Sequence, residues 1–155
     1  MNSIYDNTKG AVGIDPQSFS GTTAVDGAAV DTLKWKTAKA ICQAGATTGT
    51  PTTFSVTFKA QDSADGSTGW ADITDPVSGT VLTAVLSAVS TAADFRISDF
   101  LGVQTKRYIR LVATPAFTGG SSPTVLAGAV IDFGPAVQNP QNTEPDVQAG
   151  SVLTA

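Results

Sequence analysis

The acidic side chains of residues 59–73 are the first place where this sequence could do chemistry. The stretch reads KAQDSADGSTGWADI and suggests a calcium-binding loop. An EF-hand loop needs acidic ligands at fixed alternating positions and a glutamate at its twelfth position. Asp62 and Asp65 are three residues apart, the next carboxylate is Asp72, and no glutamate occurs before Glu144. The ligand pattern therefore fails, and we expect no metal site here.

The same stretch fits a β-hairpin better than a metal loop. Residues 54–61 alternate apolar and polar side chains, as a strand does. Asp65-Gly66 is a turn signal, because glycine accepts a positive φ and aspartate bonds to its own backbone. Residues 70–73 then return as the partner strand. We interpret Trp70 as a packing residue at the start of that strand rather than a platform for a ligand.

Enzyme chemistry finds little support elsewhere in the chain. The sequence has no histidine, so a Ser-His-Asp or Cys-His arrangement is impossible within one chain. Two carboxylate pairs, Asp72 with Asp75 and Asp94 with Asp99, lie beside turn residues, where aspartate is common for backbone reasons. The glycine-rich stretch 117–123, FTGGSSP, lacks the lysine and helix of a phosphate-binding loop. We expect no enzyme activity, no catalytic residue and no cofactor.

The composition describes one domain with an unusually uncharged surface. The chain has 155 residues, of which 41% are hydrophobic and 14% charged, against about 25% charged in an ordinary soluble protein. Charge keeps proteins apart in solution. A surface of this kind favours either burial in an assembly or an extracellular-type β domain rich in Ser and Thr, and the composition leaves both open.

The charge balance and the ends of the sequence exclude some partners. The net charge is −4, and Lys34, Lys36 and Lys39 form no wider basic patch, so we expect no nucleic-acid binding. The start, MNSIYDNTKGAVG, lacks the apolar core of a signal peptide. No apolar run reaches the roughly 20 residues that span a membrane, so no membrane partner is expected. We predict a buried structural thiol at Cys42.

Three parts are visible along the chain. Residues 1–20 read as a polar N-terminal arm punctuated by Gly, Asn, Asp and Ser. Residues 21–134 carry the periodic apolar pattern of a folded domain. Residues 135–155 contain three prolines and little periodicity, so we predict an extended tail that does not fold by itself.

The middle part reads as β-strands. Apolar side chains fall at every second position in four runs, which is the period of a half-buried strand. The residues that we expect to face the core are Phe54, Val56, Phe58 and Ala60; Ala38, Ala40 and Cys42; Ile109, Leu111 and Ala113; and Val125, Ala127, Ala129, Ile131 and Phe133. Turn-forming clusters separate these runs. The predicted fold is therefore all-β, an antiparallel β-sandwich of the jelly-roll or Ig-like type.

One segment also fits a helix. Residues 80–95, TVLTAVLSAVSTAADF, contain leucines and valines at suitable places, but their Thr, Ser and Val content weakens a helix. We predict a strand over Val81 to Val85, a loop, and a short strand over Phe95 to Ile97. A single helical turn at residues 97–101, capped by Ser98, is a further possibility.

Two strings, FSVTFKAQDSADGSTGWADI and KRYIRLVATPAFTGGSSPTVLAGAVIDFG, resemble small structural proteins from the head-module region of tailed-bacteriophage genomes. The shared pattern is a strand ending in glutamine, a DG turn with a following Trp and Asp, a KRY-x-R strand, a Gly/Ser loop and a final apolar strand. It covers about residues 21–135. The matching residues are Gln61, Asp65-Gly66, Trp70, Asp72, Lys106-Arg107-Tyr108, Arg110, Gly119-Gly120 and Gly134-Pro135.

This resemblance implies a capsid decoration, or cement, protein with a β-sandwich fold. Such a protein is a non-enzymatic part of the virion that binds the outside of the expanded capsid. It bridges neighbouring subunits of the major capsid protein and stabilises the lattice. The implied partners are the major capsid protein and further copies of the chain, with a trimer favoured over a dimer. The implied location is the capsid exterior, after synthesis in the host cytoplasm.

The residues themselves favour contacts made by the two ends. Unfolded ends can order on contact and wrap a large area, and the edge strands of a sandwich can accept a neighbour's arm. We therefore expect intersubunit contacts from residues 1–13 and 135–155. The candidate interface residues are Ile4, Tyr5, Trp35, Trp70, Tyr108, Val137, Val147, Val152 and Leu153.

Two other functions remain open from the sequence. The first is a module that presents Trp35, Trp70 or Tyr108 to a glycan or a host surface. Only 7% of the residues are aromatic, and they are scattered, which argues mildly against it. The second is a tail or head–tail connector component, which the sequence separates poorly from a decoration protein.

Overall fold

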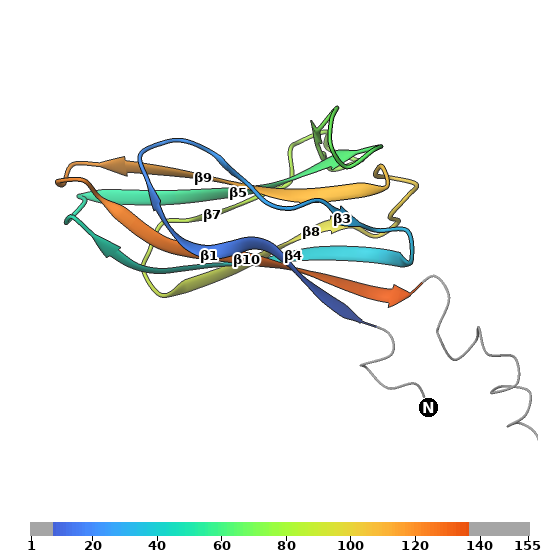
Figure 1. Cartoon of the computed structure of the whole chain (residues 1–155), viewed down its shortest axis with the longest axis horizontal. Coiled ribbons are helices and arrows are strands. Elements are labelled where there is room, and N and C mark those ends of the chain that lie inside the picture. Colours follow the sequence, from blue (N-terminus) through green and yellow to red (C-terminus); the bar gives the residue numbers. More distant parts are fainter. Residues whose placement is uncertain (1–7, 137–155) are drawn as a thin grey trace, which may run out of the picture.

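The protein is an all-β sandwich in a computed structural model that describes residues 8–136. Two antiparallel sheets pack face to face, and no helix occurs in that range (Figure 1). The strands are β1 (Lys9–Ser20), β2 (Val25–Asp26), β3 (Val30–Asp31), β4 (Trp35–Thr48), β5 (Thr53–Ser63), β6 (Ala71–Asp72), β7 (Thr83–Leu86), β8 (Thr91–Ser98), β9 (Tyr108–Thr118) and β10 (Thr124–Ala136).

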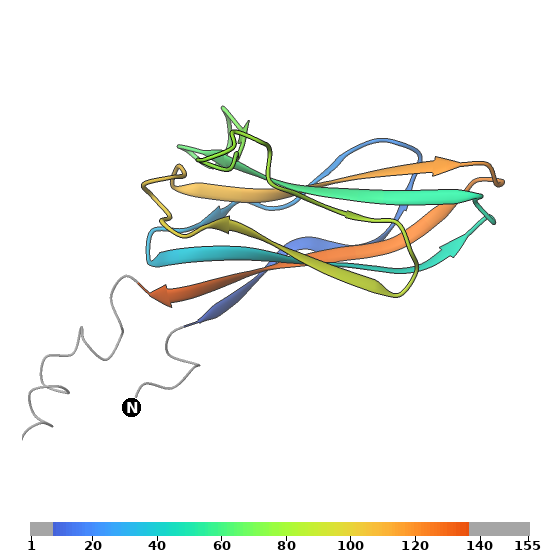
Figure 2. The same cartoon turned by 180° about the vertical axis from the view of Figure 1, so that it is seen from behind.

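The strand order identifies the sandwich as a jelly roll. Sheet A has the order β1-β10-β4-β8, and in sheet B β9 and β5 form the centre, with β2 and β3 beside β9 and with β6 and β7 beside β5. The chain therefore crosses between the sheets repeatedly, as Figures 1 and 2 show from opposite sides. An immunoglobulin fold would place the first two strands in one sheet. Here β1 and β2 lie in different sheets, as in a jelly roll.

The core lies between the two sheets and follows the alternation of the sequence. In β4 the buried residues are Ala38, Ala40 and Cys42, and in β9 Ile109 and Leu111 are fully buried. The other residues predicted to face the core are also buried, except Phe54, which packs against the core but is only partly covered. The small inward side chains of β4 face the core beside large ones from β10 in the same sheet and opposite large ones from β5 and β9 in the other sheet.

The predicted buried state of Cys42 is confirmed. Its side chain has 0% exposure and no disulfide partner. Burial, with a smaller contribution from the negative charge of Asp94, raises the pKa of the Cys42 thiol to about 12. Since the thiolate is the reactive form, this cysteine acts as a small core side chain rather than a nucleophile.

The N-terminal segment differs from its prediction. Residues 9–20, assigned to the polar arm by sequence, form β1 and pair with β10 from Lys9↔Phe133 to Ser20↔Thr124. Two register shifts interrupt this pairing, between Val12 and Ile14 and between Ile14 and Gln17. Such bulges break the alternation of apolar side chains, so the strand has no regular period to read in the sequence. The last strand, β10, continues to Ala136, so residues 135 and 136, assigned to the tail by sequence, belong to the sheet.

The segment with the possible helix forms strands, as predicted. Its first half contains β7, and β8 is longer than the predicted strand at Phe95 to Ile97. The chain then turns without forming a helix. The Ser98 hydroxyl accepts a hydrogen bond from the Phe100 backbone N–H at 3.0 Å, and the Gln104 N–H donates to the Phe100 carbonyl at 2.9 Å. Ser98 therefore caps a turn, as expected, but the turn begins after Ser98 rather than at residue 97 and is not a helix.

A close contact between two glycines joins the N-terminal strand to the segment between β2 and β3. The Gly27 N–H donates to the Leu111 carbonyl at 2.8 Å, and a Cβ placed on Gly27 would lie 1.8 Å from the Gly13 carbonyl oxygen. We expect Gly27→Ala to destabilise the fold by about 2 kcal/mol or more, because backbone on both sides must move. Urea unfolding measures this. Gly10→Ala, where a Cβ meets nothing within 4 Å, is the control and should change stability little.

Candidate functional site

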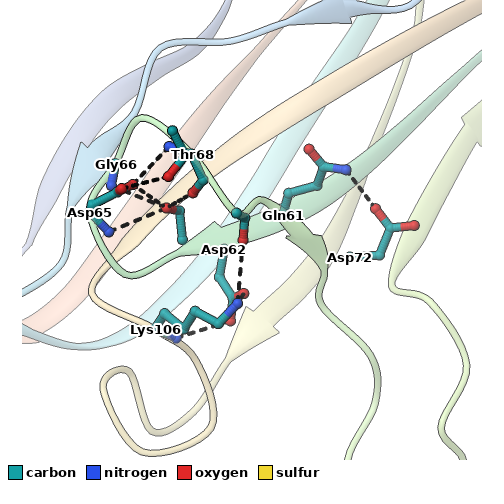
Figure 3. A network of polar contacts seen from close by, with 9 residues as sticks. Gln61, Asp62, Asp65, Gly66, Thr68, Asp72 and Lys106 are labelled. Atoms are coloured by element: carbon teal, nitrogen blue, oxygen red, sulfur yellow. Dashed lines mark hydrogen bonds and ion pairs between the residues drawn. The ribbon is translucent and has the colours of Figure 1, made fainter.

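The loop from Ser63 to Thr68 is a hydrogen-bonded turn, as the hairpin prediction requires (Figure 3). One carboxylate oxygen of Asp65 accepts from the backbone N–H groups of Ser67 and Thr68, both at 2.8 Å, and from the Ser63 hydroxyl at 2.9 Å. The other accepts from the Thr68 hydroxyl at 2.6 Å. Gly66 has φ +76°, which explains the glycine. Asp65 is therefore committed to the turn, and among residues 8–136 no group of acidic, Cys or His side chains is suited to hold a metal.

The lowered pKa values of three carboxylates predict how the stability of the fold depends on pH. Hydrogen bonds from Thr68, Ser67 and Ser63 hold the pKa of Asp65 well below its ordinary value of 3.8. The pKa of Asp31 is lowered chiefly by Arg107, and that of Asp72 by Lys59 and Gln61.

A folded-state pKa below the unfolded value stabilises the fold above that unfolded value, and the contribution is lost as pH falls. We therefore expect stability to stay level above about pH 5 and to decline below about pH 4. Urea unfolding at successive pH values tests this. Asp65→Asn should weaken the fold at pH 7 and make the acid decline shallower. An unchanged pH profile in that variant would contradict the role of Asp65.

The outer face of sheet B carries a network that joins β5, β6 and β9. The Arg110 guanidinium donates to the Gln61 side-chain oxygen at 2.7 Å, and the Gln61 amide donates to Asp72 at 2.8 Å. Lys59 completes the network through an ion pair with Asp72 at 2.8 Å. The Trp70 ring lies against Arg110, with the guanidinium carbon 4.4 Å from the ring centroid. The Trp70 ring therefore packs on its own sheet.

The other two candidate aromatics lie in different places. Tyr108 is partly covered by the hairpin loop, since a Cβ on Gly66 would lie 2.9 Å from its ring, and the Arg107 guanidinium carbon is 5.2 Å from the ring centroid. Trp35 is on sheet A, where its ring centroid is 6.0 Å from that of Phe133. Trp70 and Tyr108 thus lie near the same hairpin, and Trp35 is separate. The remaining candidates, Ile4, Tyr5, Val137, Val147, Val152 and Leu153, lie outside the described residues.

Three of the four carboxylates considered for catalysis, Asp72, Asp75 and Asp99, have other partners in the structure. Asp72 belongs to the network on sheet B, and Asp75 accepts from the backbone N–H groups of its own loop, at Val77 and Ser78. Asp99 forms an ion pair with Arg96 at 2.6 Å. Asp94 and Asp99 line the same hollow, together with Lys39, Arg96 and Asp132, but within residues 8–136 no hydrogen bond joins the two carboxylates of either pair. Asp72 joins strands, and Asp75 and Asp99 make their contacts within or beside their own loops.

One end of the sandwich gathers features that the sequence did not bring together. Lys9, at the start of β1, pairs with Phe133, near the end of β10, so the chain enters and leaves sheet A at the same end (Figure 1). The turns at residues 32–34 and 99–107 lie at this end too. They are joined by a hydrogen bond from the Thr32 N–H to the Arg107 carbonyl at 3.0 Å, and the Leu101 N–H donates to the carbonyl of Lys36, in β4, at 2.8 Å. We call this region the chain-exit end.

Three large apolar side chains are exposed on these two turns. Leu33 is 63% exposed, Phe100 61% and Val103 86%. Single exposed apolar residues are ordinary, but a group on adjoining turns beside both chain exits is a candidate interaction site. Sequence reasoning missed these residues, because each lies in a short turn without periodicity. The available signal was an apolar side chain in a segment otherwise made of turn residues.

Charge is distributed unevenly along the sandwich. Lys9, Lys34, Lys36, Lys106 and Arg107 lie at the chain-exit end. At the opposite end, the loops contain only Gly, Ala, Ser, Thr, Pro and Val, and none of their residues is charged. These loops are residues 21–24, 49–52, 87–90 and 119–123. The two ends of the molecule are therefore chemically different surfaces.

Comparisons with known proteins give no family for this chain. No protein-family model matches it, and no curated protein matches it. Within residues 8–136, no helix is long and apolar enough to cross a membrane.

Solved structures of phage and viral origin are similar in part. The exported protein XepA of PBSX has a TM-score of 0.48 and 14% identity, over 84% of this chain and 38% of XepA. The SPBc2 prophage-derived protein YomS has a TM-score of 0.35 and 12% identity, over 81% of this chain and 93% of YomS. A structure of infectious bursal disease virus, Gx strain, has a TM-score of 0.45 and 13% identity, over 86% and 32%. The chain spans 38% of the length of XepA, and likenesses of this strength do not establish a function.

Proposed function

We propose that this chain is a non-enzymatic structural protein of a phage virion that binds the outer surface of the capsid. The observation that carries the proposal is the chain-exit end, where Leu33, Phe100 and Val103 are exposed beside both chain exits. An apolar centre with charged residues around it is the usual anatomy of a protein interface. Lys34, Lys36 and Lys106 supply the charged surroundings here.

Several of the residues that carry the sequence resemblance support the same proposal, because they contact one another. Gln61 contacts both Asp72 and Arg110, and Arg110 contacts Trp70. Lys106 pairs with Asp62 beside the same hairpin, at 3.4 Å (Figure 3). These members of the shared pattern form one hairpin on sheet B that is bonded to the turn at residues 99–107, whereas Gly119-Gly120 and Gly134-Pro135 lie elsewhere, in the loop before β10 and in β10 itself.

In this proposal the chain-exit end faces the capsid and the uncharged loops face outward. The N-terminal segment, with Ile4 and Tyr5, continues from the start of β1 at the capsid side. Copies of the chain associate around a symmetry axis, with a trimer favoured over a dimer, and each assembly bridges neighbouring subunits of the major capsid protein. Bridging stabilises the lattice because separating the subunits would then also break the contacts with the decorating protein.

A truncation tests the contribution of the N-terminal segment. Deletion of residues 2–7 leaves Lys9 and the pairing of β1 with β10 intact. We expect the truncated protein to unfold at the same temperature as the full chain and to lose capsid binding, measured by co-sedimentation. Binding at full occupancy would exclude this segment from the interface.

The copy number in purified virions distinguishes this proposal from a connector role. A decoration protein covers the lattice in many copies, whereas a tail or connector component occurs in few. Quantitative mass spectrometry against the major capsid protein provides the ratio. A glycan-binding role has less support, because Trp70 packs on Arg110 and Tyr108 is partly covered by Gly66. Binding of the isolated protein to a glycan array would restore that alternative.

A further inference from the structure

Strand β8 forms one edge of sheet A, and no second strand of the described chain pairs with it. Within residues 8–136 it pairs with β4 alone, from Ala38↔Ser98 to Ala44↔Thr91. An edge strand presents a row of N–H and C=O groups that can pair with a further strand. The free side of β8 is therefore a place where another chain can extend the sheet.

The opposite edge of sheet A is protected against such pairing. There, β1 contains Pro16, which has no backbone N–H, and two bulges that interrupt its register. The segment at Gly27 also lies directly against Gly13 of this strand. Between Thr91 and Arg96, by contrast, β8 pairs with β4 in continuous register and contains neither a proline nor a bulge. Of the two edges, β8 is the one that can accept a partner.

The outward side chains of β8 carry charges that the neighbouring strand does not complement. Asp94 and Arg96 are both exposed on the outer face, and the Arg96 side chain is 62% exposed. The residue opposite Arg96 on β4 is Lys39, which itself lies opposite Asp132, and the residue opposite Asp94 is Ile41. Like charges directly opposite one another destabilise a sheet, and an apolar neighbour offers Asp94 no hydrogen-bond donor.

The other nearby charges leave both side chains able to bind a further partner. Asp99 forms an ion pair with Arg96 at 2.6 Å, and the negative charge of Asp75, in the loop before β7, also reaches Arg96. The pair with Asp99 is exposed and uses one guanidinium nitrogen, so it contributes little to stability and leaves other N–H groups to donate. Within the described residues, Asp94 forms no ion pair.

A second copy of the chain would supply the missing charges if its β8 paired antiparallel with this one about a twofold axis at Phe95. The residue before the axis in one copy then lies opposite the residue after it in the other. Asp94 therefore faces the partner's Arg96, and Arg96 faces the partner's Asp94, with Cβ atoms about 4.5–5.5 Å apart. An axis at Asp94 would instead place two aspartates opposite each other. A row across the joined sheets reads Asp132, Lys39, Arg96 and the partner's Asp94.

The inward side of β8 fits the same axis. Phe95 packs against the core but is only partly buried, because it lies on the edge strand. On the twofold axis the Phe95 rings of the two copies would lie opposite one another and lose solvent exposure together. Aromatic pairs across neighbouring strands stabilise a sheet.

We propose that two copies of this chain pair through β8, antiparallel and with the twofold axis at Phe95, and join their two four-stranded sheets into one. The proposal concerns the free protein and does not rest on capsid binding. Because the pairing has twofold symmetry, it is not the contact within a trimer. The trimer of the proposed function needs a different surface, and β8 then joins copies that belong to two trimers.

Charge reversal followed by mixing tests this in the purified full-length protein. Asp94→Arg alone and Arg96→Asp alone each place like charges opposite one another at both symmetry-related positions. Each variant should raise the dissociation constant of the pair at least about tenfold, measured by sedimentation equilibrium. An equimolar mixture of the two variants restores opposite charges at both positions and should associate as strongly as the unmodified protein. Both side chains are exposed, so circular dichroism should show an unchanged fold.

Asp15→Arg is the matched control, because Asp15 is exposed on the opposite edge strand, β1. It should associate as the unmodified protein does. A trimer formed through another surface persists in each variant, so the gain in mass on mixing is what reports pairing through β8. The proposal is overturned if either reversed variant associates normally, if mixing produces no gain, or if the unmodified protein shows no pairing. None of these results involves capsids, so the proposed function is tested separately.

Discussion

Replacing both Phe100 and Val103 with aspartate should abolish capsid binding and leave the fold intact. The two side chains are 61% and 86% exposed, so their replacement disturbs no core contact. In the proposed complex they are buried at the centre of the interface. A carboxylate buried there without a partner costs about 3 kcal/mol or more. Each 1.4 kcal/mol changes an equilibrium constant about tenfold, so affinity should fall by at least about 100-fold.

Val89→Asp is the matched control for this experiment. Val89 is 50% exposed and lies in a loop at the opposite, uncharged end. It should bind capsids as the unmodified protein does. Thermal unfolding of both variants shows whether the fold is preserved. If Phe100→Asp/Val103→Asp decorates capsids normally while Val89→Asp does not, the molecule is oriented the other way round. If both bind normally, neither end carries the interface.

Phe58→Ala should destabilise the sandwich by about 3–5 kcal/mol, the usual cost of truncating a buried phenylalanine to alanine. Phe58 is 0% exposed, and its neighbours across the sheet are Ala84 and Ala113, which are too small to fill the space left behind. Since a domain of this size is stable by about 5–15 kcal/mol, the loss is a large part of the total.

Urea unfolding followed by circular dichroism measures this change, with Phe100→Ala as the control. Phe100 is exposed, so its truncation should change stability by no more than about 0.5 kcal/mol. A similar loss from both variants would mean that Phe100 packs in the core and is not free to bind a partner. The pair of variants therefore also tests the assignment of Phe100 to the interaction surface.

The central part of the fold was predictable because each strand and turn is specified by residues within its own short segment. The strands β4, β5, β9 and β10 alternate regularly, and their inward faces are those expected from the sequence. The hairpin at Asp65-Gly66 was also predictable, since a turn of this kind is specified by its own residues. β1 was not, because its bulges and Pro16 destroy the period on which strand prediction depends.

The candidate site was less predictable than the fold, because it forms only when distant segments meet. Leu33 and Phe100 lie 67 positions apart in the sequence, in turns that are joined by hydrogen bonds from the Thr32 N–H and hydroxyl to the Arg107 carbonyl. Nothing in the sequence of either turn indicates that the two turns lie side by side in the fold. The aromatic residues Trp35, Trp70 and Tyr108 were conspicuous in the sequence. In the structure their rings pack within the domain, against Phe133, Arg110 and the loop at Gly66 respectively. Aromatic residue type was therefore a poorer guide to the candidate surface than the position of an apolar residue in a turn.

Co-sedimentation of the purified full-length protein with expanded, undecorated capsids of its own phage tests the central claim most directly. The proposed function predicts saturable binding at a fixed ratio to the major capsid protein. Light scattering of the free protein then gives the mass of the binding unit, with a trimer expected. A stable, folded protein that stays in the supernatant at every concentration would contradict the account and leave the chain-exit end as a surface for a different partner.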